Sequence, residues 1–277
     1  YVRIEFAGRE FSTDKELNGL SLYAIGSGTT LDYIQVHQPS DDGIEFFGGT
    51  ANLKHAVITA GQDDGIDWEY GWVGKAQFLI VQQDVPLSNN GFEMDNNRVN
   101  STFLPRSNPT VYNATLLGLG RGVTPGGGDK RQGLAFRSAV AGNLNNIIVA
   151  GFSDVGVFFE EPTIAIAKAG DLKLAGTIFY QNGKTDADTV SSVTTVGTTA
   201  FDVKGWVLAQ PGNREADPLF ESPFNRETFS AKVKPSSPAF SGAQPVPAND
   251  PFFENVNFIG AVGNDDWTAG WTAYPKN

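Results

Sequence analysis

The sequence predicts an all-β protein whose short strands stack into a solenoid, and a repeat is the first observation behind this prediction. Asp-Asp-Gly-Ile-Glu-Phe at residues 41–46 returns as Asp-Asp-Gly-Ile-Asp-Trp at residues 63–68, 22 residues later. A glycine-rich turn and a second apolar run follow each copy, at residues 53–58 and 76–81. Such units bury their apolar face only by stacking on their neighbours.

Further copies of the signature are the second observation. Two begin at Asn18 and Asn90, looser ones begin at Gln132 and Val155, and only the step from Asn90 to Gln132 is long, at 42 residues. That step contains two stretches that we interpret as inserted loops, near residues 95–110 and 118–131. The period lacks the 3.6-residue pattern of helical repeats and the motif of leucine-rich repeats. We therefore predict a right-handed parallel β-helix, the handedness being that of parallel crossovers in general.

The second strands of the repeats align as a third observation. Tyr33, His55 and Phe78 fall at one position on successive coils, which favours a structural role for His55 in a ladder or the interior. Asn113 and Asn146 continue this position and predict a short amide ladder. The aligned strands are residues 31–36, 53–58, 76–81, 111–116 and 144–149.

The ends of the chain are less regular. Residues 1–8 read as the last strand of a coil whose beginning lies upstream, and weaker strands are expected at 164–166, 174–180 and 201–209. Residues 211–251 are rich in proline yet keep many phenylalanines, which a disordered tail would not. We predict β-helix coils over residues 1–210 and an irregular capping segment, packed on the solenoid, over residues 211–277.

Composition excludes several classes of function. The net charge of −11 and pI of about 4.6 argue against nucleic acid as a partner and favour cations or basic groups. The chain has no cysteine, which excludes disulfides, thiolate metal sites and cysteine nucleophiles. No apolar run is long enough for a transmembrane segment.

Several blocks resemble a family of bacterial exported β-helix proteins. They are the Asn18-Gly19-Leu20 start, residues 41–50, residues 62–67, Gly74–Phe78, and the terminal stretches 258–261 and 266–272. Members of that family occur among cell-surface lipoproteins and type IX secretion substrates of Bacteroidetes and among envelope proteins of Proteobacteria. The resemblance implies a secreted or outer-membrane-surface location and an envelope protein or glycan as partner, and it supplies no catalytic residues.

Carboxylates recur at fixed places in the repeat. If Ile44 and Phe46 point inward, alternation places Glu45 outside, and Asp67 and Glu93 above it at about 4.8 Å per coil. A second column runs along the turn through Asp42 and Asp64, beside Asp41 and Asp63. Stacked carboxylates repel by about 1 kcal/mol in water and more in a shielded groove.

Three arrangements would offset this repulsion. Hydrogen bonding of Asp and Asn to turn amides is the favoured interpretation for the turn column. Bound Ca²⁺ is the second, and a carboxylate pair for hydrolysis is the third. The candidate metal ligands are Asp41, Asp42, Asp63, Asp64, Glu45, Asp67 and Glu93.

Aromatic residues lie beside the acidic columns. Trp68 aligns with core residues, whereas Tyr70 and Trp72 fall outside the repeat consensus and are candidate ligand-binding residues that would stack on a sugar. Packing of these two rings in a turn is the alternative and the favoured interpretation.

The leading hypothesis is a non-enzymatic surface protein whose acidic, aromatic-edged face binds a glycan, a cation or a partner. A Ca²⁺-assisted polysaccharide lyase or glycoside hydrolase is the first alternative, with the aspartates at 41, 42, 63 and 64 acting beside a loop arginine such as Arg98, Arg106 or Arg121. The Gly-His-Gly and Arg-x-Lys motifs of polygalacturonase-like hydrolases are missing, as is a nucleophile elbow. A structural subunit of the envelope or of a filament is the second alternative.

Overall fold

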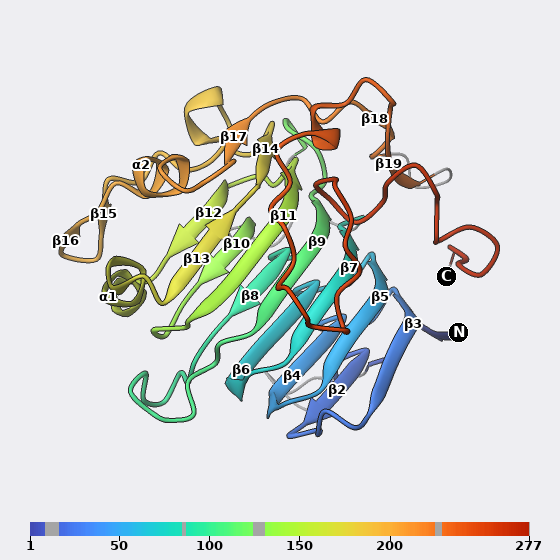
Figure 1. Ribbon diagram of the computed structural model, residues 1–277, viewed down its shortest axis with the longest axis horizontal. Helices are drawn as coiled ribbons and strands as arrows, with labels where there is room; N and C mark the ends of the chain where they lie inside the picture. The colour runs from blue at the N-terminus through green and yellow to red at the C-terminus, as the bar shows by residue number, and fades with distance from the viewer. Residues whose placement is uncertain (9–16, 85–86, 124–130, 225–228, 277) are drawn as a thin grey trace.

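Two parallel sheets run along the solenoid in the computed structural model and enclose its interior (Figure 1). The structure describes residues 1–8, 17–84, 87–123, 131–224 and 229–276. The larger sheet has nine strands, in the order β1-β3-β5-β7-β9-β11-β14-β17 with β13 beside β11, and the smaller has six, β12-β10-β8-β6-β4-β2. All pairings within these two sheets are parallel, and consecutive strands alternate between the sheets from β2 to β12. This is the predicted parallel β-helix.

The strands of the larger sheet are β1 (Val2–Glu5), β3 (Thr30–His37), β5 (Asn52–Thr59), β7 (Lys75–Gln82), β9 (Thr110–Leu117), β11 (Gly142–Ala150), β13 (Leu172–Ala175), β14 (Ile178–Tyr180) and β17 (Arg214–Glu215). Those of the smaller sheet are β2 (Leu20–Tyr23), β4 (Ile44–Gly49), β6 (Ile66–Trp72), β8 (Phe92–Met94), β10 (Gln132–Phe136) and β12 (Val155–Phe159). Two antiparallel hairpins follow, β15 (Thr195–Val196) with β16 (Thr199–Ala200) and β18 (Phe220–Ser222) with β19 (Ser230–Val233).

The long strands of the larger sheet bend at one residue each. Tyr33, His55 and Phe78 have φ of 54°, 48° and 61°, and Asn113 and Asn146 follow at 56° and 58°. A residue in the left-handed region kinks a strand, so each long strand turns a corner of the coil there. The side chains at this corner stack on one another, with ring centroids 4.2 Å apart for Tyr33–His55 and 5.0 Å apart for His55–Phe78.

The predicted amide ladder takes a different form from the one expected. Asn113 donates from Nδ2 to the carbonyl of Phe258 at 2.8 Å, and Asn146 donates to the carbonyl of Gln244 at 2.9 Å. The amides therefore bond to the backbone of the C-terminal segment, which lies across the sheet at this corner.

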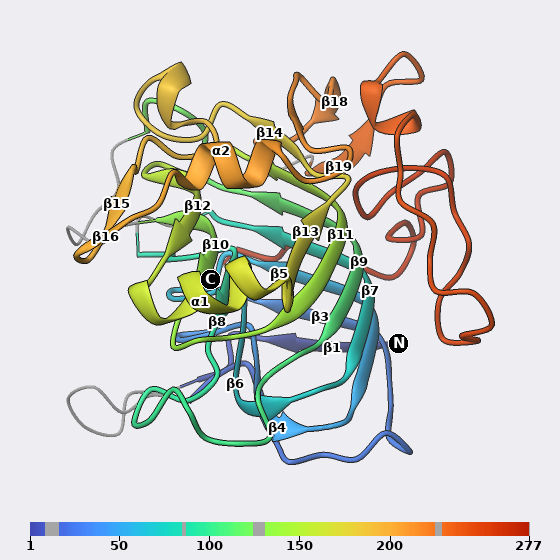
Figure 2. The same ribbon diagram turned by 60° about the vertical axis from the view of Figure 1, so that its left-hand side comes forward.

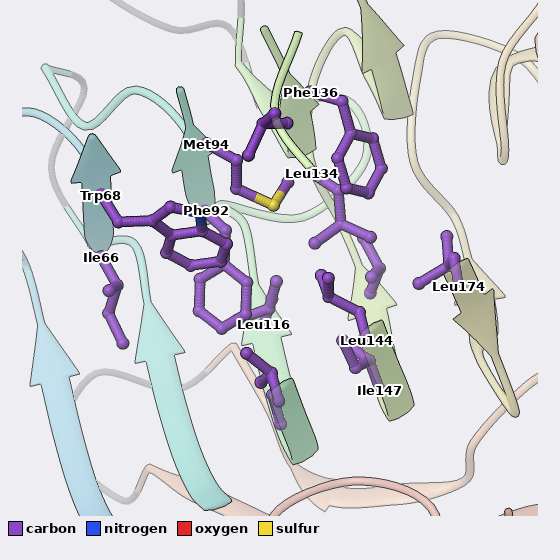
Figure 3. Packing of buried hydrophobic residues seen from close by; sticks show 14 of the residues in the cluster. Ile66, Trp68, Phe92, Met94, Leu116, Leu134, Phe136, Leu144, Ile147 and Leu174 are labelled. Carbon is purple, nitrogen blue, oxygen red and sulfur yellow. The ribbon is translucent and has the colours of Figure 1, made fainter. Parts of the chain in front are cut away.

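Apolar side chains from both sheets fill the interior of the coils. Ile66 and Trp68 point inward above Phe92 and Met94, and Leu116 faces them from the opposite sheet (Figure 3). Trp68 is 1% exposed, as its alignment with Leu22 and Phe46 predicted.

Two short helices replace strands that the sequence predicted. α1 (Glu161–Ala169) covers residues 164–166, and α2 (Val203–Leu208) covers the strand expected at 201–209, so both predictions were wrong. A proline in its first turn and a left-handed Gly170 after its last residue delimit α1. Asp202 caps α2 by accepting from the Gly205 N–H at 2.9 Å. None of the described helices is long and apolar enough to cross a membrane.

The C-terminal segment, residues 229–276 as described, lies against the outer face of the larger sheet, away from the smaller sheet (Figure 2). Glutamine and asparagine side chains of the sheet bind its backbone N–H and C=O groups, as the backbone of a neighbouring strand would. Gln35 donates to the Ala273 carbonyl at 2.6 Å and accepts from the Ala273 N–H at 3.0 Å. Gln77 makes the same paired contact with Glu254, at 2.8 Å each way.

Candidate functional site

The outer face of the smaller sheet carries two columns of polar side chains, which we call the acidic face. The first column follows the predicted register, because Glu45 lies opposite Asp67 and Asp67 lies opposite Glu93 on successive strands. Stacking coils one repeat apart thus brings together carboxylates that are 22 and 26 residues apart in the sequence.

The second column lies two residues further along each strand and was missed in the sequence analysis. Glu69 lies opposite Phe47 on the neighbouring strand. The column continues on the next two coils with Asp95 and Arg137, whose backbone N–H groups each donate to a carbonyl of the preceding coil at 2.9 Å. Glu160 follows through its N–H to the Phe136 carbonyl, also at 2.9 Å. Extending the alternation by one more pleat would have found all of these residues.

The first column faces away from the core but is hardly exposed. Glu45, Asp67 and Glu93 are 8%, 9% and 7% exposed. Burial raises the pKa of Glu45 to about 7, opposed by a hydrogen bond from Asn18 and reinforced by the charge of Glu69. Burial also raises the pKa of Asp67 well above its usual range, with the Glu45 charge as the next cause.

The second column shows the same effect. Burial raises the pKa of Glu69 to about 7 with help from the Asp95 charge, and Arg98 opposes the shift. Burial likewise raises the pKa of Asp95 to about 6. The raised pKa values of these four carboxyls favour their protonated form at a pH where ordinary carboxyls are fully charged.

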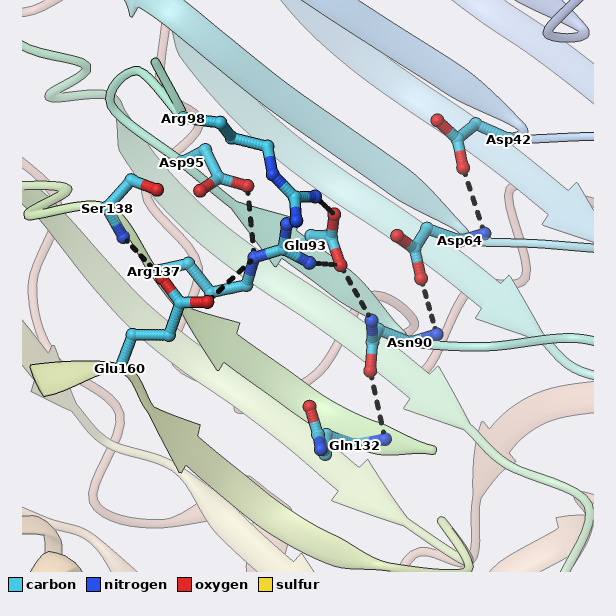
Figure 4. A network of polar contacts seen from close by, with 10 residues as sticks. All are labelled: Asp42, Asp64, Asn90, Glu93, Asp95, Arg98, Gln132, Arg137, Ser138 and Glu160. Atoms are coloured by element: carbon cyan, nitrogen blue, oxygen red, sulfur yellow. Dashed lines mark hydrogen bonds and ion pairs between the residues drawn. The ribbon is translucent and has the colours of Figure 1, made fainter. Parts of the chain in front are cut away.

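Arginine neutralises one end of the acidic face. The Arg137 guanidinium makes a hydrogen-bonded ion pair with Glu93, and its Nε lies 3.2 Å from Asp95 and 3.9 Å from Glu160 (Figure 4). Arg98, from the loop after β8, reaches Glu93 at 3.5 Å. Among the described residues, no arginine or lysine ion pair reaches Glu45, Asp67 or Glu69 at the other end.

The turn column forms a hydrogen-bonded ladder between coils. Asp42 accepts from the Asp64 N–H at 3.0 Å, Asp64 accepts from the Asn90 N–H at 2.5 Å, and Asn90 accepts from the Gln132 N–H at 3.1 Å (Figure 4). Each side chain thus binds an amide of the next coil through one oxygen. Burial raises the pKa of both aspartates well above the usual range, although the amide contacts of Asp64 oppose its shift.

Three groups of carboxylates are close enough to share a cation. Asp42, Glu45 and Asp67 offer oxygens within 4.8 Å of one another, as do Asp64, Asp67 and Glu93, and as do Asp41, Asp42 and Asp63. Asp67 belongs to two groups, and its Oδ1 is buried with no hydrogen-bond partner among the described residues. Hard oxygen ligands in such a set suit Ca²⁺.

Aromatic rings border the unneutralised end. Tyr23 and Phe47 precede Glu69 in the second column and stack with centroids 4.4 Å apart and planes 7° apart. Tyr70 lies 6.3 Å from Phe47 and is 46% exposed, so it remains a candidate for sugar stacking.

Trp72 does not belong to this border, which corrects the expectation of a Tyr70–Trp72 platform. It is 1% exposed, stacks on Phe46 at 4.0 Å and donates from Nε1 to the Ala51 carbonyl at 2.9 Å. A register shift between β4 and β6 explains the difference: Phe47 lies opposite Glu69, but Gly49 lies opposite Trp72. The extra residue leaves Tyr70 outside and turns the Trp72 indole inward.

The loop between β8 and β9 forms a wall beside the border. The Tyr70 N–H donates to the Asn96 carbonyl at 2.7 Å, and the Gly71 N–H donates to the Ser107 hydroxyl at 3.0 Å. A Cβ at Gly71 would lie 2.4 Å from the Pro105 carbonyl oxygen, so only glycine permits this approach. Part of the second predicted insertion, residues 124–130, lies outside the described residues.

Fold and acidic face together define a parallel β-helix protein whose outer surface carries a partly neutralised carboxylate array. Residues 1–222 match the family described as the pectate-lyase-like beta helix domain, and the chain therefore belongs to this family. Neither the curated proteins nor the solved structures contain a match to the chain.

Proposed function

We propose that the protein is a polysaccharide-binding β-helix protein of the cell surface or extracellular space that holds Ca²⁺ in its acidic face. The observation that carries the proposal is the group of Asp42, Glu45 and Asp67, three buried carboxylates within 4.8 Å of one another and outside the reach of Arg98 and Arg137. Either protons or a cation must offset their repulsion, and above neutral pH a cation is the more effective.

A glycan would bind beside this cation, along the aromatic border. Tyr23 and Tyr70 offer exposed rings, and Glu69 and Glu45 offer carboxyl groups to sugar hydroxyls. An acidic polymer of the pectate type would need the cation as a bridge, because the face itself would repel it. The family assignment supports a polysaccharide as the partner.

Calcium is expected to stabilise the protein in a pH-dependent way. The folded pKa values of Glu45 and Glu69, about 7, lie above the ordinary glutamate value, so without a cation stability should fall as the pH rises from about 4.5 through 7. Calcium binds the deprotonated carboxylates, so at pH 8 it should raise the melting temperature by several degrees, whereas at pH 5 it should have little effect. Thermal unfolding in EDTA and in millimolar Ca²⁺ at both pH values measures this.

Asp67→Asn is the decisive variant for this prediction, because Asp67 belongs to two of the three carboxylate groups. It should raise the melting temperature in EDTA at pH 8 and abolish the calcium increment. Asp171→Asn, which removes the charge of an exposed residue immediately before β13, is the matched control and should keep the full increment. Equal melting temperatures of the wild-type chain with calcium and with EDTA at pH 8 would rule out the calcium site.

Tyr70→Ala is expected to abolish retention of the protein on immobilised pectate while changing its stability by less than about 0.5 kcal/mol, since about half of the residue is exposed. Affinity electrophoresis against a pectate gel with calcium measures retention. Tyr1→Ala, which removes an exposed ring immediately before β1, is the control. Retention of Tyr70→Ala equal to that of the wild-type chain would show that the aromatic border does not bind the glycan.

Cleavage of the polysaccharide is the second candidate function, because Arg98 and Arg137 meet the carboxylates at Glu93. Arginine beside ionised carboxylates stays protonated, which makes Arg137 a poor proton abstractor and a good stabiliser of negative charge. Glu69, with a pKa of about 7, has the properties of a general acid. Release of reducing ends, or of unsaturated products that absorb in the ultraviolet, separates a hydrolase or a lyase from a binding protein.

A further inference from the structure

A cavity lies on the opposite side of the molecule from the acidic face. It has a volume of about 710 Å³ and opens between the C-terminal segment and the corner of the larger sheet where the strands bend. Its floor consists of Tyr33, His55 and Phe78, and Phe258 and Trp267 line it from the C-terminal segment. The volume falls within the range of small-molecule sites.

The wall formed by the C-terminal segment is held in place at several points. The paired Gln77–Glu254 contact fixes its entry at 2.8 Å each way, and Asn113 fixes it at the Phe258 carbonyl. Lys54 pairs with Glu254 at 2.9 Å and lies over the Phe252 ring. These contacts hold the wall of the cavity in place.

The aromatic floor is also fixed. His55 makes a hydrogen bond from Nδ1 to Asp32 at 2.8 Å, which orients its imidazole edge. Trp267 donates from Nε1 to the Ala261 carbonyl at 2.8 Å and meets the His55 ring at 5.0 Å with a 63° angle. Since Tyr33 and Phe78 cover both faces of His55, the imidazole presents an edge to its surroundings.

Exposed polar side chains form the rim of the cavity. Asn255, Asn257, Asn264 and Asp265 line the cavity, and their side chains make no hydrogen bond or ion pair to another of the described residues. Amide groups both donate and accept, and carboxylates accept, so together they match the donor and acceptor pairs of sugar hydroxyls. We propose that this cavity is a binding site for a neutral saccharide of one to three units, distinct from the acidic face.

Charge and hydrogen bonding select this class of ligand over two others. Asp265, with Glu254 nearby, would repel an anionic sugar or a phosphate. An organic cation would leave the amide groups of the rim without hydrogen-bond partners, and choline is therefore the ligand that tests this alternative. A ligand with apolar C–H groups and several hydroxyls satisfies both the aromatic floor and the polar rim.

Titration of the full chain with cellobiose, maltose and xylobiose, followed by calorimetry and tryptophan fluorescence, tests the proposal. At least one of these saccharides should bind in EDTA, and Asn257→Ala and Asp265→Ala should each weaken binding about tenfold, the loss of a hydrogen bond to ligand. His55→Phe, which keeps a ring in the stack and removes its ring nitrogens, should weaken binding to a similar extent.

Variants on the acidic face separate this site from the proposed function. Asp67→Asn and Tyr70→Ala should leave the binding of these small saccharides unchanged. The proposal is overturned if none of the three saccharides binds, if the rim variants bind as well as the wild-type chain, or if Asp67→Asn abolishes binding. Binding of choline in place of the saccharides would overturn it in favour of a cation site.

Discussion

Replacing Arg137 by methionine is expected to destabilise the protein by about 3–5 kcal/mol at pH 8, the usual cost of removing one partner from a buried ion pair. The guanidinium pairs with Glu93, lies 3.2 Å from Asp95 and is 3.9 Å from Glu160. Methionine fills a similar volume without charge, so it leaves these carboxylates uncompensated. Chemical denaturation at constant calcium measures the loss.

The pH dependence identifies the cause of this loss. Without the Arg137 guanidinium, the pKa of Asp95 should rise further above its value of about 6. Protonation of Asp95 at pH 5 should then relieve its repulsion from the neighbouring carboxylates. The loss should therefore be smaller at pH 5 than at pH 8. An equal loss at both pH values would show that Arg137 contributes by packing alone.

Arg98→Met is the matched control. Arg98 contacts the same Glu93 at 3.5 Å, but its side chain is 59% exposed, so solvent screens the pair. Its removal should cost less than about 1 kcal/mol. A comparable cost for the two variants would contradict the assignment of Arg137 as the buried partner of Glu93 and of Arg98 as a partner that solvent screens.

The sequence predicted the columns because stacking in a solenoid is one-dimensional. Once the period of 22 residues was known, alternation along a strand placed Glu45, Asp67 and Glu93 above one another, as the register shows. The ladder of Asp42 and Asp64 followed from the same period, and its hydrogen bonds to amides follow the favoured interpretation, except that the amides belong to the next coil.

The period could not predict what one inserted residue does. Tyr70 and Trp72 lie after the shift in register between β4 and β6, and the bulge there decides which ring faces outward. Arg137 lies 44 residues after Glu93, and the alternation reaches it only when the intervening loops are left out of the ladder. The two helices were missed because the repeat was extended through them. The proline, the capping residue and the glycine that delimit them interrupt the repeat locally.

The cavity under the C-terminal segment was beyond sequence reasoning for a different reason. Its floor is a ladder position that was assigned correctly to Tyr33, His55 and Phe78, whereas its rim comes from a segment without a period. Gln77 and Asn113 read as ladder or strand residues, and nothing in their spacing shows that they bind the backbone of Glu254 and Phe258.

Gly65→Ala is expected to destabilise the protein by at least about 3 kcal/mol, because a Cβ at this position would lie 2.3 Å from the Val81 Cγ1 and 2.7 Å from the Gly91 carbonyl oxygen. The glycine of each repeat signature stacks on the glycine of the next coil, so a side chain would push two coils apart. The φ of Gly65 is not in the left-handed region, and the requirement is therefore for space between coils.

Gly28→Ala provides the control, since an added Cβ there meets no atom within 4 Å. It should change stability by no more than about 1 kcal/mol, the range of a glycine-to-alanine change at an unstrained site. The clash in Gly65→Ala also displaces the turn that carries Asp64, so the calcium increment should fall with the stability. A stable Gly65→Ala chain with an unchanged calcium increment would contradict both the close stacking of coils and the placement of the cation beside this turn.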